Sequence, residues 1–170
     1  LEIARNNDIG NYYNPHESLR WKNPQNIKVY FLSKTGKEYI FEEAIKICNN
    51  SFRNVVRFVV VNNPQNADIV IHYVEYLQKP YWGYTDWKWK TFNNTKYITE
   101  ADIQIALKRE GGNYLSNTYY LLTTLHEFGH ALGLPHSNNP NDIMYPQLHQ
   151  CYRKNNFSKR DINTLLKTYK

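Results

Sequence analysis

The chain has 170 residues, of which 41% are apolar and 15% aromatic, and its formal net charge is +6. This length suits one domain with a sizeable hydrophobic core, and the apolar content excludes an intrinsically disordered chain. The sequence contains no run of the roughly 18 apolar residues that a transmembrane helix needs, so we expect no membrane span.

Residues 1–20 are polar, rich in asparagine and without hydrophobic periodicity, which predicts an N-terminal arm. They show neither the charged start nor the apolar run of a signal peptide. Residues 21–170 would then form a single domain.

Three segments rich in apolar residues predict strands at 27–32, 55–61 and 67–74. Between the first two, apolar residues recur at helical spacing from 37 to 50, with glutamates early in the segment, where the helix dipole favours them. The order strand, helix, strand, strand predicts a right-handed crossover into a mainly parallel sheet.

Residues 75–100 interleave aromatic side chains with lysines, and two interpretations are open. Aromatic rings beside cations can stack on the bases of nucleic acids. An edge strand and loop whose aromatic side chains cover the sheet is the interpretation that we favour, with Tyr81–Trp87 as the strand. Because lysine and arginine are otherwise spread along the chain, we expect solvated faces and no nucleic-acid partner.

The second half begins with an alternating segment at 101–107, which predicts another strand. A helix is expected to run from Asn117 through Leu121, Leu122 and Leu125 into a histidine-containing segment. A final helix should run from Ser158 to Tyr169, because Ser158 suits an N-cap and Asp161 lies near the positive helix end.

A histidine motif lies at the end of the longer of these helices. His126 and His130 are four residues apart, so a helix places both imidazoles on one face. Glu127 follows the first histidine, where a carboxylate can reach a water on a bound metal without ligating the metal. Gly133 can adopt a positive φ and end the helix, which would bring His136 back as a third ligand. Three protein ligands with one open position are typical of a catalytic zinc site.

Residues 126–136 match the HExxHxxGxxH pattern of the metzincin peptidases, and residues 143–146 resemble their methionine turn. Ser137, directly after the third histidine, is similar to the matrixin branch, which includes the matrix metalloproteinases. The resemblance is strong from residue 121 to 148 and weaker elsewhere. It implies an α+β zincin domain: a twisted, mixed, mainly parallel five-stranded sheet, about three helices, and a zinc cleft between an upper and a lower subdomain.

The resemblance also implies roles at the site. The three histidines would hold one catalytic zinc, Glu127 would act as general base and acid, and Met144 would form an apolar floor beneath the metal. Pro146 occupies the place where astacins and serralysins have a tyrosine that reaches the metal, so no such ligand is implied. The chain lacks the histidines and the Gly/Asp-rich loops with which animal matrixins hold structural zinc and calcium, so we expect neither.

In matrixins, the pocket for the residue after the scissile bond is walled by the active-site helix and by the segment that follows the methionine turn. Those walls correspond here to Leu122 and to Tyr145, Pro146 and Leu148. Such an apolar pocket predicts cleavage before a bulky apolar residue.

Arg160 stands where matrixins usually have the first of two adjacent aspartates, the one that holds the mature N-terminal ammonium, so we do not expect that anchor. Asp161 would keep the second aspartate's role of bracing the methionine turn. His16, His72 and His149 lie outside the motif, and we expect none of them to bind the catalytic zinc.

We therefore expect a secreted, monomeric zinc-dependent endopeptidase that acts on proteins or peptides, in a processed form whose signal peptide is not part of this sequence. One alternative is a non-catalytic zinc-binding adhesion module, but binding alone has no need of Glu127 as a base. A second alternative is a basic, aromatic module for nucleic acid or polysaccharide, which leaves the histidine motif unexplained. Cys48 and Cys151 allow one disulfide, although Cys48 equally suits a buried thiol, and this pairing stays open.

Overall fold

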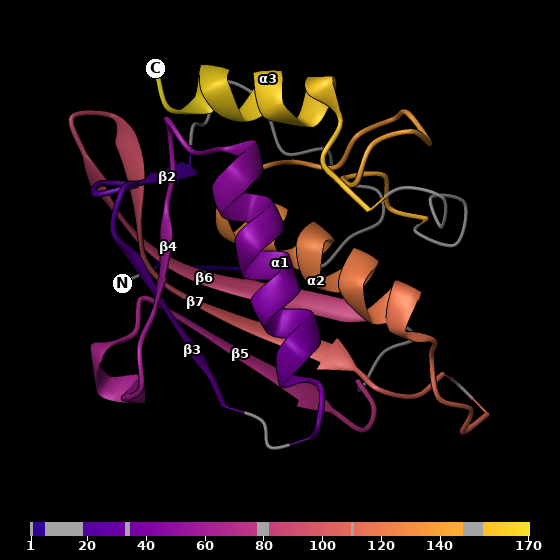
Figure 1. The fold of residues 1–170 in the computed structure, drawn as a ribbon. Helices are drawn as coiled ribbons and strands as arrows, with labels where there is room; N and C mark the ends of the chain where they lie inside the picture. Colours follow the sequence, from indigo (N-terminus) through magenta and orange to yellow (C-terminus); the bar gives the residue numbers. More distant parts are fainter. Residues whose placement is uncertain (1, 6–18, 33–34, 78–81, 110, 148–154) are drawn as a thin grey trace.

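The computed structural model describes residues 2–5, 19–32, 35–77, 82–109, 111–147 and 155–170. Helices α1 (Glu38–Ser51) and α2 (Asn117–Ala131) lie next to each other on one face of a twisted sheet, and α3 (Lys159–Thr168) lies beyond one end of it (Figure 1). The described chain is thus an α+β domain with three α-helices, which confirms the expected fold class.

The sheet has the strand order β1-β6-β7-β5-β3-β4, and β2 pairs with β7 beside this path. Strands β3 (Ile27–Phe31), β4 (Phe58–Val60), β5 (Ile69–Val74) and β7 (Thr95–Ala106) are mutually parallel. Along β5 and the second half of β7 buried and half-buried residues alternate, as expected for strands with one face against the helices. The crossover from β3 through α1 produces this parallel arrangement, as the sequence predicted.

Strand β4 is shorter than the expected strand at 55–61. The backbone N–H groups of Val55 and Val56 both donate to the carbonyl of Phe52, in a turn that follows α1. These residues are therefore committed to the turn, and pairing with β3 starts only at Phe58. A 3₁₀ turn, η1 (Pro64–Asn66), then leads towards β5.

Strand β6 (Gly83–Phe92) pairs antiparallel with β7 in a long hairpin. The turn consists of Asn93 and Asn94, which have φ values of 48° and 61°. Asparagine tolerates this left-handed region better than most residues, and two such residues suit the turns that match the twist of a hairpin. The strand expected at Tyr81–Trp87 is thus part of a longer one, and Tyr81 itself lies outside the described residues.

The sheet has seven strands, whereas five were expected. The additional strands come from the segment predicted to be an arm: β1 (Glu2–Arg5) pairs antiparallel with β6, and β2 (Leu19–Trp21) pairs parallel with β7. Both strands are short and their partners lie about 80 residues away in the sequence, so local periodicity does not reveal them.

The start of α3 agrees with the predicted cap at Ser158, and α2 also begins with a serine cap, which was not predicted. The side chain of Ser116 accepts a hydrogen bond from the N–H of Tyr119 at the start of α2. Ser158 and Asp161 form a reciprocal capping box at the start of α3, which satisfies two N–H groups that the helix leaves free. No helix in the described part of the chain combines the length and apolar character needed to cross a membrane.

The main hydrophobic core lies between the sheet and α1 and α2. The ring centroids of Phe58 on β4 and Phe128 on α2 are 4.9 Å apart, which joins the ligand-bearing helix to the sheet. Cys48 on α1 is fully buried and carries a free thiol, and Cys151 lies outside the described residues.

Candidate active site

Helix α2 presents the first two histidines on one face, as their spacing predicted. The Nε2 atoms of His126 and His130 are 3.0 Å apart, and both side chains are buried. The helix thereby fixes two candidate ligands without any loop.

The turn after α2 brings the third histidine to the other two. The N–H of Gly133 donates to the carbonyl of His130, and the N–H of Leu134 donates to the carbonyl of Gly129, the two bonds of a Schellman motif. Gly133 has a φ of 92°, and a Cβ added there would lie 1.9 Å from the carbonyl oxygen of Leu19. Glycine is thus required both for the backbone conformation and for the approach of β2.

The three Nε2 atoms form a triangle that fits one tetrahedral zinc. The Nε2 of His136 lies 3.3 Å from that of His126 and 3.1 Å from that of His130. Zn–N bonds of about 2.0–2.1 Å with tetrahedral angles place ligand nitrogens about 3.3 Å apart. No other group of three or more His, Cys, Asp or Glu side chains among the described residues converges in this way.

Backbone carbonyls determine which ring nitrogen of His126 and His130 carries the proton. The Nδ1–H of His126 donates to the carbonyl of Ile143 at 2.7 Å, and that of His130 donates to the carbonyl of Leu134 at 2.9 Å. Because a carbonyl can only accept, each Nδ1 carries the proton and each Nε2 keeps its lone pair for a metal.

The pKa values keep these histidines neutral. Burial, together with nearby His136, lowers the pKa of His126 to about 3, against the opposing hydrogen bond to Ile143. Burial and the neighbouring imidazoles also hold the pKa of His130 well below its ordinary value, and burial lowers that of His136. Neutral imidazole is the form that binds a metal, so the site is ready for one at neutral pH.

Glu127 is the carboxylate of the site and is almost completely buried. Its Oε2 accepts a 2.5 Å hydrogen bond from the hydroxyl of Thr85 on β6. Burial raises the pKa of Glu127 to about 8, although the Thr85 hydrogen bond acts in the opposite direction. A cation held by the histidines would favour the ionised carboxylate, as a base requires.

Met144 lies directly beneath α2. A Cβ added to Gly129 would lie 2.2 Å from the Met144 sulfur, so glycine leaves the space that this side chain fills. Met144 is only 1% exposed, and its role as an apolar floor beneath the metal stays a prediction.

Comparison with known proteins identifies the family. The matrixin family model matches residues 15–170, nearly the whole chain. The chain belongs to the matrixin family. Membership supports a metalloprotease and implies a catalytic zinc, which the cluster of His126, His130 and His136 is able to hold.

Two curated matrixins show how far the similarity extends. The chain is 27% identical to macrophage metalloelastase of Rattus norvegicus over 143 residues, which are 81% of this chain and 30% of that protein. It is 41% identical to matrilysin of Mus musculus over 51 residues, which are 29% of this chain and 19% of that protein. The chain thus spans less than a third of the length of either relative.

In this matrixin, α3 holds the loop that follows His136. Asp161 accepts a 2.8 Å hydrogen bond from the N–H of Ile143, which confirms the expected brace of the methionine turn. Asp142 is 2% exposed and accepts hydrogen bonds from Ser137, from Ser158 at 2.7 Å and from Arg160 at 2.7 Å.

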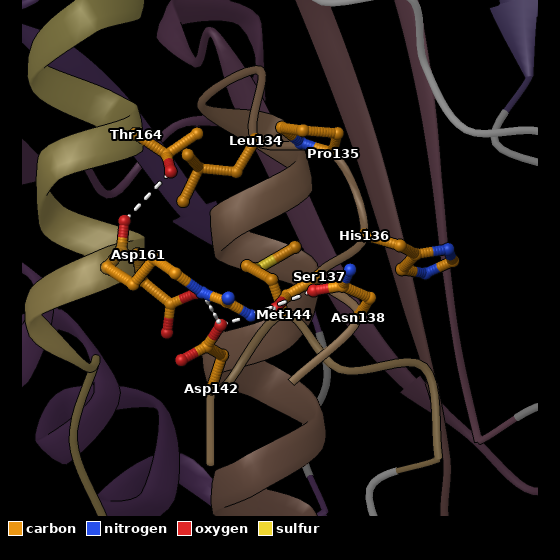
Figure 2. Close-up of a pocket in the computed structure, with 10 residues that line it drawn as sticks. Leu134, Pro135, His136, Ser137, Asn138, Asp142, Met144, Asp161 and Thr164 are labelled. Carbon is orange, nitrogen blue, oxygen red and sulfur yellow. Dashed lines mark hydrogen bonds and ion pairs between the residues drawn. The ribbon is translucent and has the colours of Figure 1, made fainter. Parts of the chain in front are cut away.

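Figure 2 shows Asp142, Ser137 and Asp161 among the residues that line a pocket formed by the loop and the first turns of α3. The guanidinium of Arg160 also donates to Ser137 and Asn138, on the loop that presents the third histidine. Burial raises the pKa of Asp142, but the hydrogen bonds from Ser137, Ser158 and Arg160 outweigh it, and the net pKa lies below the ordinary value. Asp142 is therefore an ionised clasp between the loop and α3.

Side chains from three other elements hold the C-terminal carbonyls of α2. The indole of Trp87 donates to the carbonyl of His130, that of Trp21 donates to Ala131, and the hydroxyl of Tyr169 donates to Leu132. The carbonyl of His130 thereby accepts a second hydrogen bond beside that from Gly133, and the other two are among those that a helix end leaves without helical partners. The orientation of the ligand-bearing turn thus depends on β2, β6 and the end of the chain.

The residues expected to form a substrate pocket have different surroundings. Leu122 has no exposed surface and belongs to the main core, whereas Tyr145 and Pro146 are half-buried. Leu148 lies outside the described residues. The structure therefore places Leu122 in the core and Tyr145 and Pro146 partly at the surface, and the shape of the expected pocket stays a prediction.

The remaining histidines lie away from the cluster or outside the description. His72 on β5 pairs with Asp102 on β7 at 2.9 Å, and it is not part of the metal-binding triangle. His16 and His149 fall outside the described residues. Sequence reasoning missed two residues that act on the site, Thr85 and Asp142, because their roles come from contacts with distant segments.

Proposed function

We propose that this matrixin is a zinc-dependent endopeptidase. The observation that carries the proposal is the triangle of three histidine Nε2 atoms, 3.0–3.3 Å apart, beside the buried carboxylate of Glu127. A binding module would need the triangle alone, so the buried acid favours catalysis.

The chain's own residues would divide the work as follows. The histidines hold the metal, which when bound acidifies a water and polarises the scissile carbonyl. Glu127 takes a proton from the attacking water and later gives it to the nitrogen of the leaving amine. The hydroxyl of Thr85 holds the Glu127 carboxylate in place during both transfers.

The substrate would lie along β6. Strand β1 pairs only with Asp86–Trp89 of β6, so within the described chain no strand occupies that edge at Gly83–Thr85. A Cβ at Gly83 would lie 2.6 Å from Glu127 Oε1, so this edge adjoins the catalytic acid. An extended peptide can pair with such an edge through its backbone.

For the residue after the cut we propose a preference for bulky apolar side chains. Tyr145 and Pro146, which are half-buried, would line the pocket together with Leu148, and Leu122, which has no exposed surface, would support them from the core. A Leu-sized side chain gains about 1.5–3 kcal/mol by burial, or roughly ten- to a hundredfold in selectivity. Profiling cut sites on a peptide library tests this, and a preference for Lys, Asp or Glu at that position would contradict it.

The decisive experiment compares Glu127→Ala with the parent protein. We expect the variant to keep its zinc and to lose activity on a denatured protein by about 10²–10⁴-fold or more, since one residue serves both proton transfers. Glu43→Ala, a change of an exposed glutamate on α1, is the control and should be fully active. Activity of the Glu127 variant within about tenfold of the parent, or parent activity that a chelator does not abolish, would contradict the proposal.

The structure weakens the nucleic-acid interpretation of residues 75–100. Trp87 and Trp89 are each 8% exposed and point into the core, so they are not available to stack on bases. We further propose that the protein is secreted and monomeric, and gel filtration of the purified protein tests the second point.

A further inference from the structure

A cluster of aromatic rings and a guanidinium lies next to the start of β6 and has no role in the chemistry above. The ring centroids of Trp82 and Tyr119 are 4.9 Å apart in an edge-to-face arrangement. The guanidinium carbon of Arg109 lies 5.8 Å from the centroid of Trp82 and 5.5 Å from that of Tyr119. Arg109 is exposed, and the two rings are half-buried. We name these three residues the Arg109 cluster.

The position of the Arg109 cluster relative to Glu127 follows from two elements. Trp82 directly precedes Gly83, which packs against Glu127 and Thr123. On α2, Tyr119 precedes Thr123 by one turn and Glu127 by two, which places it about 12 Å along the helix from the acid. An extended peptide advances about 3.4 Å per residue, so the cluster lies roughly three residues from the reacting bond.

The direction in which the substrate peptide runs along β6 decides whether the Arg109 cluster lies before or after the scissile bond. Antiparallel pairing is slightly more stable per residue than parallel pairing, and β6 already pairs antiparallel with both of its neighbours. A peptide antiparallel to β6 has its C-terminal part towards the start of the strand. The Arg109 cluster therefore lies on the side of the residues after the cut.

Resting on the proposed peptidase function, we infer that Trp82, Arg109 and Tyr119 form a subsite for an acidic side chain at about the third residue after the scissile bond. Both rings lie within cation–π distance of the guanidinium carbon, and an arginine stacked in this way can still bind a carboxylate through its N–H groups, often in a bidentate manner. Neighbouring charges agree with this: Lys108 forms an ion pair with Glu75, and among the described residues Arg109 forms no ion pair of its own. Lys37, which precedes α1 and donates to the side chain of Asn117 at the start of α2, adds a further positive charge.

The expected strength of the preference for an acidic side chain follows from the exposure of Arg109. A partly exposed charge pair with a fixed geometry should change kcat/KM by roughly three- to tenfold between acidic and basic side chains. Salt should weaken the preference, because the pair is open to solvent.

The test uses a peptide that the zinc-loaded parent protein cleaves, with the cut bond located by mass spectrometry. Versions with Glu, Gln or Lys at the third position after the cut are compared by kcat/KM. We expect the order Glu, Gln, Lys in the parent protein, loss of the preference in Arg109→Ala and its reversal in Arg109→Glu. Arg53→Glu, a charge reversal at the opposite end of α1, is the control and should keep the parental order.

Equal preferences in the parent protein and in Arg109→Glu would overturn the subsite while leaving the peptidase function intact. A preference for Lys in the parent protein, or a charge preference only before the cut, would do the same. Absence of chelator-sensitive cleavage of every peptide and of denatured protein would overturn the peptidase function and, with it, the subsite.

Discussion

Replacing Asp142 by alanine should destabilise the protein, because this buried carboxylate joins the loop after His136 to α3. The carboxylate is 2% exposed and accepts a 2.7 Å hydrogen bond from Ser158, a 2.7 Å charged one from Arg160, and one from Ser137. Hydrogen bonds to charged groups each contribute about 1.5–3 kcal/mol, but Arg160 is half-exposed and water can replace part of its bond. We therefore expect the free energy of unfolding to fall by about 3 kcal/mol at pH 7.

The pH dependence gives an independent check. The pKa of Asp142 is lower in the folded protein than its ordinary value, so its stabilising effect is present above about pH 4 and is lost as the pH falls through the folded value. The stability difference between parent and Asp142→Ala should therefore shrink progressively below about pH 4.

Urea unfolding in a chelator, with the metal removed from both proteins, measures this difference without a contribution from zinc. Glu43→Ala is the matched control, since this exposed carboxylate makes only a 3.9 Å pair with Lys46, and it should change the stability by less than about 0.5 kcal/mol. A loss below about 1 kcal/mol for Asp142→Ala, or a difference that stays constant down to pH 3, would refute the role of Asp142 as an ionised clasp.

Three further predictions concern the site itself. Gly133→Ala should cost more than about 3 kcal/mol and weaken zinc binding, because the new methyl group meets the backbone of Leu19 at a positive φ; near-parental urea unfolding would contradict this. Thr85→Val should lower kcat about tenfold with zinc retained, because Glu127 loses its donor, and an unchanged kcat would remove Thr85 from the mechanism. Elemental analysis should find one zinc per chain in the parent protein and a loss in His130→Ala; two tightly bound zinc ions, or full occupancy in the variant, would disprove the assignment.

The sequence predicted those parts of the site that lie close together in the chain. The spacing of the two histidines on α2, the turn at Gly133 and the cap at Ser158 are local, so periodicity and residue type sufficed. The three helices and strands β3, β4, β5 and β7 were predicted for the same reason, although β4 is shorter than expected.

What the sequence did not reveal depends on distant contacts. Strand β1 forms only by pairing with β6, and the hydroxyl of Thr85 meets Glu127 only because β6 lies against α2. Asp142 likewise gains its role only from the contact with Arg160 on α3. The Asn93–Asn94 turn does have a local signal, because both residues tolerate a positive φ, but it lies within an aromatic segment that does not by itself define where the strands end.

The position of Trp87 at the end of α2 also allows metal binding to be detected by tryptophan fluorescence. Trp87 donates to the carbonyl of His130, and the ring centroids of these two residues are 6.3 Å apart. At such a separation, a coloured ion such as Co²⁺ held by the histidines would quench the emission of this tryptophan by energy transfer. Metal uptake, exchange and loss could then be followed in the unlabelled protein by its own fluorescence.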